Sequence, residues 1–349
     1  MRGNYASVDQ HSRISLTVVG GAPGAGKTTL IRHLLEYASG RRLAAVITDE
    51  DAIDPAMIAR HDGQRLILHN GCVCVRSDDD GAAALAALAE DPDCPEHVLL
   101  DGAGWTDPRR LSGYGYMPGY CLDGTIVVLD ATTLRAGTND SATEAQLREH
   151  ARVADVVLLN KIDLAGDDEA DAAQRSLERL APGVRVVWCD RCRISPALLL
   201  GAPDGPDGVD GRTVVGEWTA DFVPAPVRNA APLRAGAPRG EQHRSWCLVS
   251  EAAVDGLEFR DWVHRLPPTI LSGRGTVYLR KEPQHRQTFH LLGAHWRLER
   301  GAPWGRDVPS TRLLLAGVGA ARRTSSRART DADADGESGL ASISRETTA

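Results

Sequence analysis

The sequence is poor in aromatic side chains and has no long apolar run. Phenylalanine, tyrosine and tryptophan make up 5% of its 349 residues, and methionine occurs three times. No segment is apolar over the length that a helix needs to cross a bilayer, and Met1–Arg13 lacks the apolar stretch of a signal peptide. We therefore expect a cytoplasmic protein without a membrane partner.

Excess positive charge is also missing. The chain has 40 lysines and arginines against 47 aspartates and glutamates, and its net charge of -7 argues against a nucleic-acid partner. Cysteine is limited to seven residues, which in a reducing compartment are expected to be free thiols or metal ligands. The remaining composition, 42% hydrophobic and 25% charged, is that of an ordinary globular protein, and the length suits about two domains.

The first 200 residues alternate short apolar runs with helical patterns. Ile14–Gly20 is expected to form a strand that ends in a glycine-rich turn, and Lys27–Tyr37 to form a helix with one apolar face. Further strands are expected at Leu43–Thr48, Val98–Asp101, Thr125–Leu129, Val156–Asn160 and Val184–Trp188. Helical segments such as Ala82–Ala89 and Thr143–Val153 separate them. This alternation predicts an α/β domain with a mostly parallel sheet over residues 14–200.

The composition changes after Leu200. Residues 201–244 are dense in Gly, Pro and Asp and are predicted to form a linker. Residues 245–318 are predicted to form a smaller α+β domain, in which two prolines end a helix over Phe259–Leu266. The strands of this domain are expected at Trp246–Val249, Thr276–Leu279, Thr288–Leu292, Trp296–Glu299 and Thr311–Leu315. Residues 319–349 hold almost no large apolar side chain and are predicted to be a disordered tail.

The strongest motif follows the first expected strand. Gly21, four further residues and then Gly26-Lys27-Thr28 match the phosphate loop of nucleoside triphosphatases. In such a loop, backbone N–H groups surround the phosphates, the lysine offsets the charge of the β and γ oxygens, and the hydroxyl binds Mg²⁺. The loop residues expected to bind the nucleotide are Gly21, Gly24, Ala25, Gly26, Lys27, Thr28 and Thr29. The motif predicts a P-loop NTPase fold for the first domain.

A base-recognition motif, Asn160-Lys161-Ile162-Asp163, follows a later expected strand. The carboxylate of Asp163 can accept hydrogen bonds from N1–H and the 2-amino group of guanine, and adenine offers neither donor. Asn160, Lys161 and Asp163 therefore predict GTP and GDP as the ligands.

A third motif, Asp101-Gly102-Ala103-Gly104, ends the expected strand Val98–Asp101. Asp101 can hold Mg²⁺ through water, and the N–H of Gly104 can reach the γ-phosphate, as in the D-x-x-G switch of GTPases. We expect Lys27 and Asp101 to support GTP hydrolysis. No water-activating base is identified, and Asp49 and Glu50 are the nearest acids in the first switch region.

Two cysteine pairs are candidates for metal chemistry. Cys72 and Cys74 can place two thiolates on one zinc-like ion if a third group assists. The alternative is a pair of small buried side chains. Cys189 and Cys192 have the spacing of a metal or redox pair, but no second such pair completes the set. We therefore favour packing, or lining of the base pocket, for these two.

These motifs, in this order, resemble those of the CobW-type GTPases, a family of P-loop metallochaperones. The resemblance covers most of Ile14–Val318, and the matching segments are Gly21–Leu30, Gly71–Cys74, Thr106–Pro108, Leu122–Gly124, Val128–Ala131, Ala154–Asp155, Leu159–Leu164, Gly275–Leu279 and Gly293–Trp296. It implies a CobW-type C-terminal domain, binding of GTP and Mg²⁺, slow GTP hydrolysis, and delivery of a metal, often zinc or cobalt, to a client protein.

Three segments differ from the family's pattern. Val75 stands where the family's C-x-C-C motif has its third cysteine, Asp101 stands where the family usually has glutamate, and the first switch over Thr48–Asp54 is shortened. Glu50 matches a family glutamate that can bind metal. The resemblance thus implies Cys72, Cys74 and Glu50 as the zinc-like ligands, beside Thr28 and Asp101 for Mg²⁺, with a weaker zinc site than three cysteines would give.

The resulting hypothesis is a GTPase coupled to the binding of zinc or cobalt and to its delivery to an unidentified client protein. One alternative is a nucleotide-dependent interaction protein with a degenerate metal site, which the missing third cysteine favours. Another is a small-molecule kinase, which the guanine motif disfavours. A homodimer is an option that the sequence leaves open.

Overall fold

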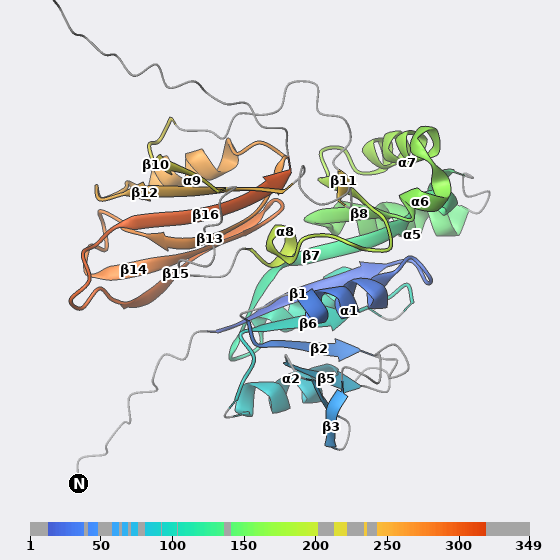
Figure 1. Cartoon of the computed structure of the whole chain (residues 1–349), viewed down its shortest axis with the longest axis horizontal. Coiled ribbons are helices and arrows are strands. Elements are labelled where there is room, and N and C mark those ends of the chain that lie inside the picture. Colours follow the sequence, from blue (N-terminus) through green and yellow to red (C-terminus); the bar gives the residue numbers. More distant parts are fainter. Residues whose placement is uncertain are drawn as a thin grey trace, which may run out of the picture.

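The computed structural model describes residues 13–37, 41–47, 58–62, 65–68, 71–75, 81–91, 93–102, 104–135, 141–201, 213–221, 234–235 and 243–318. This part of the chain forms one sheet of ten strands and one of six, and the two sheets lie side by side (Figure 1). The predicted tail, the linker residues 202–212, 222–233 and 236–242, and the first-switch residues 48–54 lie outside the described residues.

The ten-stranded sheet forms the first domain around β1 (Ile14–Gly21). Its order is β11-β9-β8-β7-β1-β6-β2-β5-β4-β3. The other strands are β2 (Leu43–Ile47), β3 (Ile58–Asp62), β4 (Arg65–Leu68), β5 (Gly71–Val75), β6 (His97–Asp101), β7 (Tyr120–Asp130), β8 (Val156–Asn160), β9 (Val186–Cys189) and β11 (Arg234–Ala235). Pairing is parallel from β11 to β5 and antiparallel from β5 to β3. The predicted α/β class and mostly parallel sheet are confirmed.

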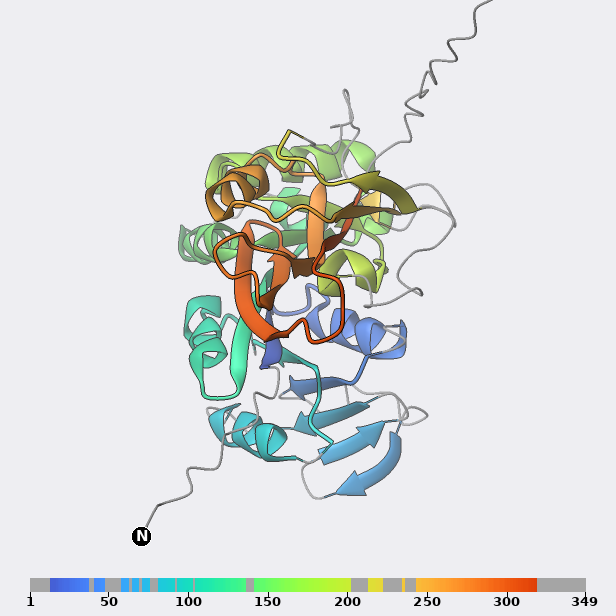
Figure 2. The same ribbon diagram turned by 90° about the vertical axis from the view of Figure 1, so that its left-hand side faces the viewer.

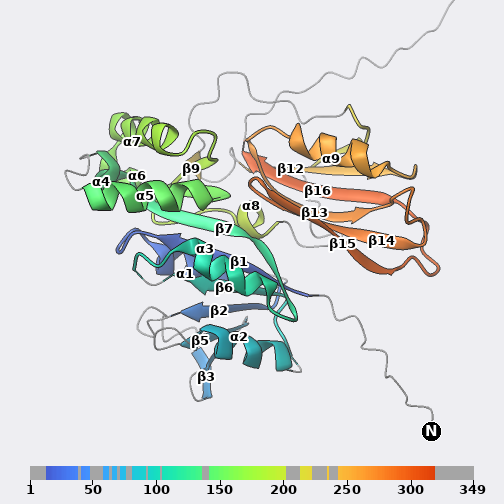
Figure 3. The same cartoon turned by 180° about the vertical axis from the view of Figure 1, so that it is seen from behind.

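Helices cover both faces of this sheet. They are α1 (Lys27–Tyr37), α2 (Gly81–Glu90), α3 (Pro108–Ser112), α4 (Ala131–Arg135), α5 (Ser141–Val153), α6 (Ile162–Ala165), α7 (Asp167–Leu180) and α8 (Pro196–Leu200), and η3 (Gly113–Tyr116) is a short 3₁₀ turn. The apolar side of α1 shares one core with α8, whereas α2 and α3 pack in a second and α4 to α7 in a third. Figure 3 shows α2, α3 and α5 over the face of the sheet opposite α1. Strands buried on both faces read as continuous apolar runs, which is why the sequence revealed them.

The six-stranded sheet forms the second domain, in the order β10-β12-β16-β13-β14-β15. Its elements are β10 (Thr213–Glu217), β12 (His243–Ser250), α9 (Gly256–His264), β13 (Ile270–Val277), β14 (His285–Leu292), β15 (His295–Pro303) and β16 (Thr311–Val318). All neighbours except β10 and β12 pair antiparallel. Phe259 and Trp262 of α9 pack on one face of the sheet beside Phe289. Figure 2 shows this domain in front of the upper part of the first sheet, away from the blue strands β3 to β5.

The segment predicted as a linker contributes to both sheets. Within residues 201–244, β10 pairs with β12, and β11 pairs with β9. The short run Thr213–Glu217 contains two adjacent valines that favour a strand, but the many Gly, Pro and Asp residues around it concealed this signal. Within the described part of the chain, no helix has both the length and the hydropathy needed to span a membrane.

Candidate functional site

The phosphate loop joins β1 to α1 and needs its glycines for two different reasons. Gly21 has φ +132°, and a Cβ there would lie 2.0 Å from the carbonyl oxygen of Val128 on β7. Gly26 has φ +116°, and a Cβ there would lie 2.6 Å from Nδ2 of Asn160. Both positions therefore require glycine for backbone conformation and for space. Gly24 also has a positive φ of +71°, but nothing lies within 4 Å of its Cβ position.

Lys27 begins α1 and its ammonium group turns back into the loop. Nζ donates to the carbonyl oxygens of Gly21 and Ala22, each over 3.1 Å, and lies 3.5 Å from that of Gly104. Burial lowers the pKa of this ammonium group, and the nearby Asp101 carboxylate opposes that shift. The charge of Lys27 is thus held between the phosphate loop and the third motif, where the β and γ oxygens of a nucleotide would lie in a phosphate loop.

Asp101 ends β6 directly beside β1, in register with Val19, and it is 4% exposed. Gly104, three residues later, has φ +54°, a conformation that glycine adopts without strain. Thr28 lies on the first turn of α1 and is partly buried. The Thr28 hydroxyl and the Asp101 carboxylate are oxygen ligands of the kind that Mg²⁺ prefers, so the donor set fits the predicted ion. Parallel pairing of β1 and β6 brings the two motifs to one edge of the sheet.

Asn160, the last residue of β8, connects the base motif to the phosphate loop. Its Nδ2 donates to the carbonyl oxygen of Ala25 over 2.8 Å, and its Oδ1 accepts from the backbone N–H of Cys192 over 2.9 Å. The Cys189 thiol lies 3.6 Å from the same Oδ1, and the Cys192 thiol donates to the carbonyl of Gly26 over 3.2 Å. Both cysteines are buried and pack in the core cluster that includes the apolar side of α1.

Lys161 and Asp163 lie on the turn after β8. Lys161 has φ +64° and donates to Oδ2 of Asp130 at the end of β7 over 2.7 Å. Burial raises the pKa of the Asp130 carboxyl, but hydrogen bonds from Lys161 and Thr132 outweigh burial and lower it overall. Asp163 is solvent-exposed, and its Oδ2 lies 3.6 Å from Nε of Arg191. Lys161 is therefore held by a partner that stays ionised, whereas Asp163 has only a weak surface pair.

A pocket of about 620 Å³ lies between these two motifs. It is lined by Gly24, Gly26 and Thr29 from the phosphate loop and by Asn160, Lys161 and Asp163 from the base motif. Arg32, His33, Glu36, Tyr37, Leu164, Arg191 and Arg193 complete its wall. Residues that lie more than 130 positions apart in the sequence therefore share one cavity. Arg191 and Arg193 were not among the predicted site residues, and only their position directly after β9 pointed to this edge.

The two cysteines predicted as zinc ligands do not line this pocket. Cys72 and Cys74 are two residues apart on β5, so both point to the same face of the sheet. They are 4% and 8% exposed, within an apolar cluster that includes Tyr120. Glu50, the third predicted ligand, and Asp49 lie outside the described residues. Where the chain is described, no group of three or more His, Cys, Asp and Glu side chains could hold a metal ion. The thiol pair suits zinc by ligand type, and it supplies two of four donors.

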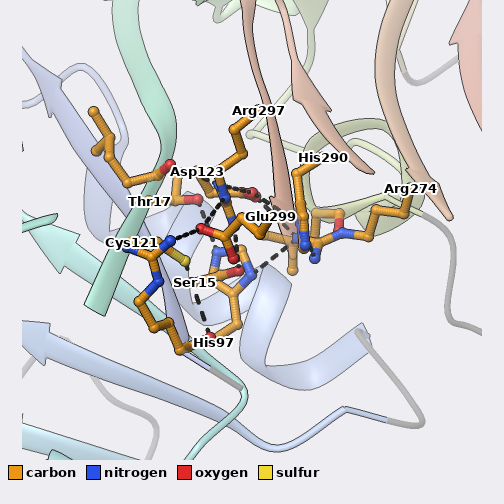
Figure 4. A network of polar contacts seen from close by, with 12 residues as sticks. Ser15, Thr17, His97, Cys121, Asp123, Arg274, His290, Arg297 and Glu299 are labelled. Atoms are coloured by element: carbon orange, nitrogen blue, oxygen red, sulfur yellow. Dashed lines mark hydrogen bonds and ion pairs between the residues drawn. The ribbon is translucent and has the colours of Figure 1, made fainter. Parts of the chain in front are cut away.

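A buried polar network joins the two domains at the opposite end of the strands, and sequence reasoning did not identify it (Figure 4). Its centre is Asp123 of β7, which is 3% exposed. Arg274 Nη2 donates to Oδ2 of Asp123 over 2.9 Å, and Arg297 Nη1 donates to Oδ1 over 3.0 Å. Leu16 pairs with Leu122 and Thr17 with Gly124, so Asp123 is the extra residue of a β-bulge. An aspartate followed by glycine within an apolar run was the available signal.

Ionisation in this network favours a charged aspartate and neutral histidines. Burial raises the pKa of Asp123, but Arg274, His290, His97 and Arg297 together hold it well below its usual range. Burial lowers the pKa of His97 to about 3 and also lowers the pKa of His290. Thr17 Oγ1 lies 2.8 Å from Nε2 of the neutral His97 ring. The carboxylate thus carries the negative charge between two buried guanidinium groups.

The fold and these motifs define a P-loop nucleotide-binding domain followed by a separate, mainly antiparallel domain. The family model for the CobW/HypB/UreG nucleotide-binding domain matches residues 15–188. The model for the C-terminal domain of the cobalamin synthesis protein CobW matches residues 243–329. The chain belongs to the CobW family.

Several curated proteins and solved structures are similar to this chain. The zinc chaperone YjiA of Escherichia coli K12 is 31% identical over 179 residues, which are 48% of this chain and 54% of the relative. The zinc chaperone CobW of a Sinorhizobium species is 25% identical over 221 residues, 54% of this chain and 62% of the relative. The chain therefore spans less than two thirds of the length of both relatives. The Zn(II)-bound YjiA GTPase from E. coli aligns over 88% of this chain and 95% of that chain, with a TM-score of 0.41 and 20% identity.

Proposed function

We propose that this protein binds GTP, hydrolyses it slowly, and couples that cycle to the binding of a transition metal, zinc or cobalt, as cargo for a client protein. The observation that carries the nucleotide part is the bond from Asn160 to the Ala25 carbonyl, because it sets the base motif against the phosphate loop across one pocket. The metal part is supported by the names of the similar proteins, which are zinc chaperones, and by the Cys72 and Cys74 pair.

Four residues of the chain would have separate roles at the phosphates. Lys27, whose ammonium group already lies against three loop carbonyls, would exchange these contacts for the β and γ oxygens. Thr28 and Asp101 would hold Mg²⁺, which neutralises the negative charge that develops on the phosphates. The N–H of Gly104 would donate to the γ-phosphate. Loss of the γ-phosphate on hydrolysis would then release the segment after β6.

Guanine selectivity would come from Asp163. A guanine base that offers N1–H and a 2-amino group satisfies both oxygens of this carboxylate, whereas adenine would leave them without donors. Arg191 now lies 3.6 Å from the same carboxylate. That pair is solvent-exposed and worth little, so a base can displace it at small cost.

Calorimetry with GDP and ADP tests the nucleotide assignment. We expect GDP to bind at least tenfold more tightly than ADP, and Asp163→Asn to remove most of that ratio. Asp168→Asn is the matched control, since Asp168 is exposed on α7 and does not line the pocket. Equal affinities for the two nucleotides in the unchanged protein would refute guanine selectivity.

A cobalt titration tests the metal assignment. Thiolate ligands give Co²⁺ a charge-transfer absorption band, so we expect one that is lost in a Cys72→Ser, Cys74→Ser double variant. Because thiolates bind only when deprotonated, the apparent affinity should fall as the pH drops. A band that survives in the double variant would place the metal elsewhere.

A second candidate function is a nucleotide-dependent interaction protein that no longer carries metal. It is favoured by the burial of Cys72 and Cys74 in an apolar cluster and by Val75 in place of a third cysteine. Guanine selectivity without any thiolate-to-cobalt band would support this candidate over the metal carrier.

A further inference from the structure

One face of the C-terminal sheet carries a pocket lined by three arginines, which the nucleotide site does not use. Leu291, Leu313 and Leu315 point to the other face, where α9 covers them. Residues of the opposite parity point away from α9. They include Thr288, Thr276 and Arg312, which are cross-strand partners in one row over β14, β13 and β16. The cavity over this row has a volume of about 360 Å³.

The charged side chains that line the pocket are all cationic, and Cys247, Phe289 and Leu314 add apolar surface. Arg274, Arg286 and Arg312 contribute guanidinium groups, Thr276 and Thr288 contribute hydroxyls, and neither Asp nor Glu lines it. Arg274 is neutralised by Asp123 of the first domain. Arg286 is paired with the exposed Asp307, whereas Arg312 is exposed and no carboxylate pairs with it within the described residues. The pocket therefore has a net positive charge and suits a ligand that carries carboxylates.

Arg286 adds a donor that has no acceptor among the described residues. Its Nη2 donates to the exposed Asp307 over 2.9 Å, and its guanidinium lies 5.2 Å from the ring centroid of Trp304. Its Nε is buried without a hydrogen-bond partner in this part of the chain. A buried, unsatisfied donor is costly to leave unpaired. An oxyanion in the pocket would supply the missing acceptor.

The chain itself contains a segment with the matching chemistry. Residues 331–337 read Asp-Ala-Asp-Ala-Asp-Gly-Glu, four acids at every second position without a basic residue between them. They begin just after residue 329, where the match to the family's C-terminal domain ends. In an extended chain, side chains at every second position share one face. We propose that the acidic run Asp331–Glu337 binds in the arginine-lined pocket of the C-terminal sheet.

The covalent connection is long enough for this contact. β16 ends at Val318, and Arg312 lies six residues before that end, about 20 Å back along the strand. Twelve residues separate Val318 from Asp331, and they can span up to about 40 Å. A tethered segment also competes at a high effective concentration, on the order of millimolar for a short flexible connection. The tail can therefore reach the pocket and exclude a weaker acidic ligand from it.

The test uses a synthetic, fluorescently labelled peptide of residues 328–340 and two full-length proteins. One is the unchanged chain, and the other carries Asp331→Asn, Asp333→Asn, Asp335→Asn and Glu337→Gln. The second protein, in which these four acids are amides, is called the neutral-tail protein. Fluorescence anisotropy should show that the peptide binds to the neutral-tail protein and binds at least tenfold more weakly to the unchanged chain, because the acidic tail of the unchanged chain competes with it. Adding Arg312→Glu to the neutral-tail protein should abolish binding. Arg260→Glu, on α9 at the other face of the sheet, should leave it unchanged.

Two results would overturn the proposal. Equal peptide affinity for both proteins would show that the tail does not occupy the pocket, which would then accept acidic segments of other proteins. No peptide binding to the neutral-tail protein, with its circular dichroism spectrum unchanged, would show that the pocket does not bind this peptide at all. Neither result bears on nucleotide binding, which GDP calorimetry on the same proteins reports separately.

Discussion

Asn160 and Ala25 lie 135 residues apart in the sequence, and the Nδ2 of one donates to the carbonyl oxygen of the other over 2.8 Å. The same side chain accepts from the backbone of Cys192, so one amide ties together the phosphate loop, the base motif and the turn after β9. Asn160 is 2% exposed, so both hydrogen bonds are largely shielded from solvent.

Asn160→Ala should weaken both the fold and nucleotide binding. Two buried hydrogen-bonding groups of the backbone lose their partner, and we expect the free energy of unfolding to fall by about 1–3 kcal/mol. GDP affinity should fall at least tenfold because the phosphate loop is no longer held at Ala25. Urea unfolding and calorimetry measure the two effects, and an unchanged GDP affinity in the folded variant would contradict this role.

Gly26→Ala should abolish nucleotide binding, whereas Gly24→Ala should only reduce it. Both glycines have positive φ, so both substitutions strain the backbone. Only at Gly26 would the new methyl group also lie 2.6 Å from Asn160 and 2.8 Å from the Cys192 sulfur. The comparison in GDP calorimetry therefore isolates the clash from the strain. Similar losses of GDP affinity in the two variants would show that the space at Gly26 is unimportant.

Lys27→Ala should eliminate GTP hydrolysis and preserve the fold. The ammonium group contacts backbone carbonyls of the loop, and its removal leaves the β and γ oxygens without their counter-charge. Phosphate release measures turnover, and circular dichroism checks the fold. Lys281→Ala, at an exposed position of the second domain, is the control. A folded Lys27→Ala protein with normal turnover would contradict the assignment.

Asp123→Asn should be among the most destabilising single substitutions in the chain. It removes the negative charge between Arg274 and Arg297, and both guanidinium groups are largely buried. Breaking a buried ion pair on one side costs about 3–5 kcal/mol. Glu144→Gln, which breaks the exposed pair with Arg148, should cost at most about 1 kcal/mol. Urea unfolding measures both changes. Comparable losses in the free energy of unfolding for Asp123→Asn and Glu144→Gln would show that the network is unimportant.

His97 should make the protein less stable in mild acid. Its folded pKa of about 3 lies below the unfolded value of about 6.5, so below pH 6.5 the unfolded state binds the extra proton. Stability is then lost as the pH falls, by up to about 1.4 kcal/mol per pH unit. His97→Gln cannot titrate, so its free energy of unfolding should fall by about 2 kcal/mol less than that of the unchanged protein between pH 6.5 and 4.5. If the free energy of unfolding of the two proteins changed in parallel with pH, this role of His97 would be refuted.

Local pattern predicted the elements around the nucleotide pocket well. The helix expected at Lys27–Tyr37 has those bounds, and the strand at Val156–Asn160 matches β8, because buried parallel strands and an amphipathic helix leave continuous and periodic apolar signals. Local pattern could not predict the strained backbone of Arg191 and Cys192, whose φ values are +50° and +54°. Their conformation depends on contacts with Asn160 and Gly26 from distant strands.

The contacts between the two domains could not be predicted from local sequence for the same reason. Asp123 lies 151 residues from Arg274 and 174 from Arg297, and no short window of sequence contains both partners of either pair. A single arginine in a strand looks the same whether it points to water or to a buried carboxylate. The expected strands at Thr288–Leu292 and Thr311–Leu315 were found within β14 and β16, but the face that each side chain joins depends on the pairing of strands.

Strand β7 carries Asp123 near its beginning and Asp130, the partner of Lys161, at its end. Seven residues in extended conformation cover about 23 Å, close to the greatest length that a chain of this size can reach. The strand therefore cannot stretch while its neighbours β1 and β8 remain paired to it. The length of β7 between Asp123, at the contact of the two domains, and Asp130, beside the turn after β8, therefore changes little in any such state. A signal that passes along β7 must take the form of a twist or a bend, and the bulge at Asp123 is where the strand yields to both most easily.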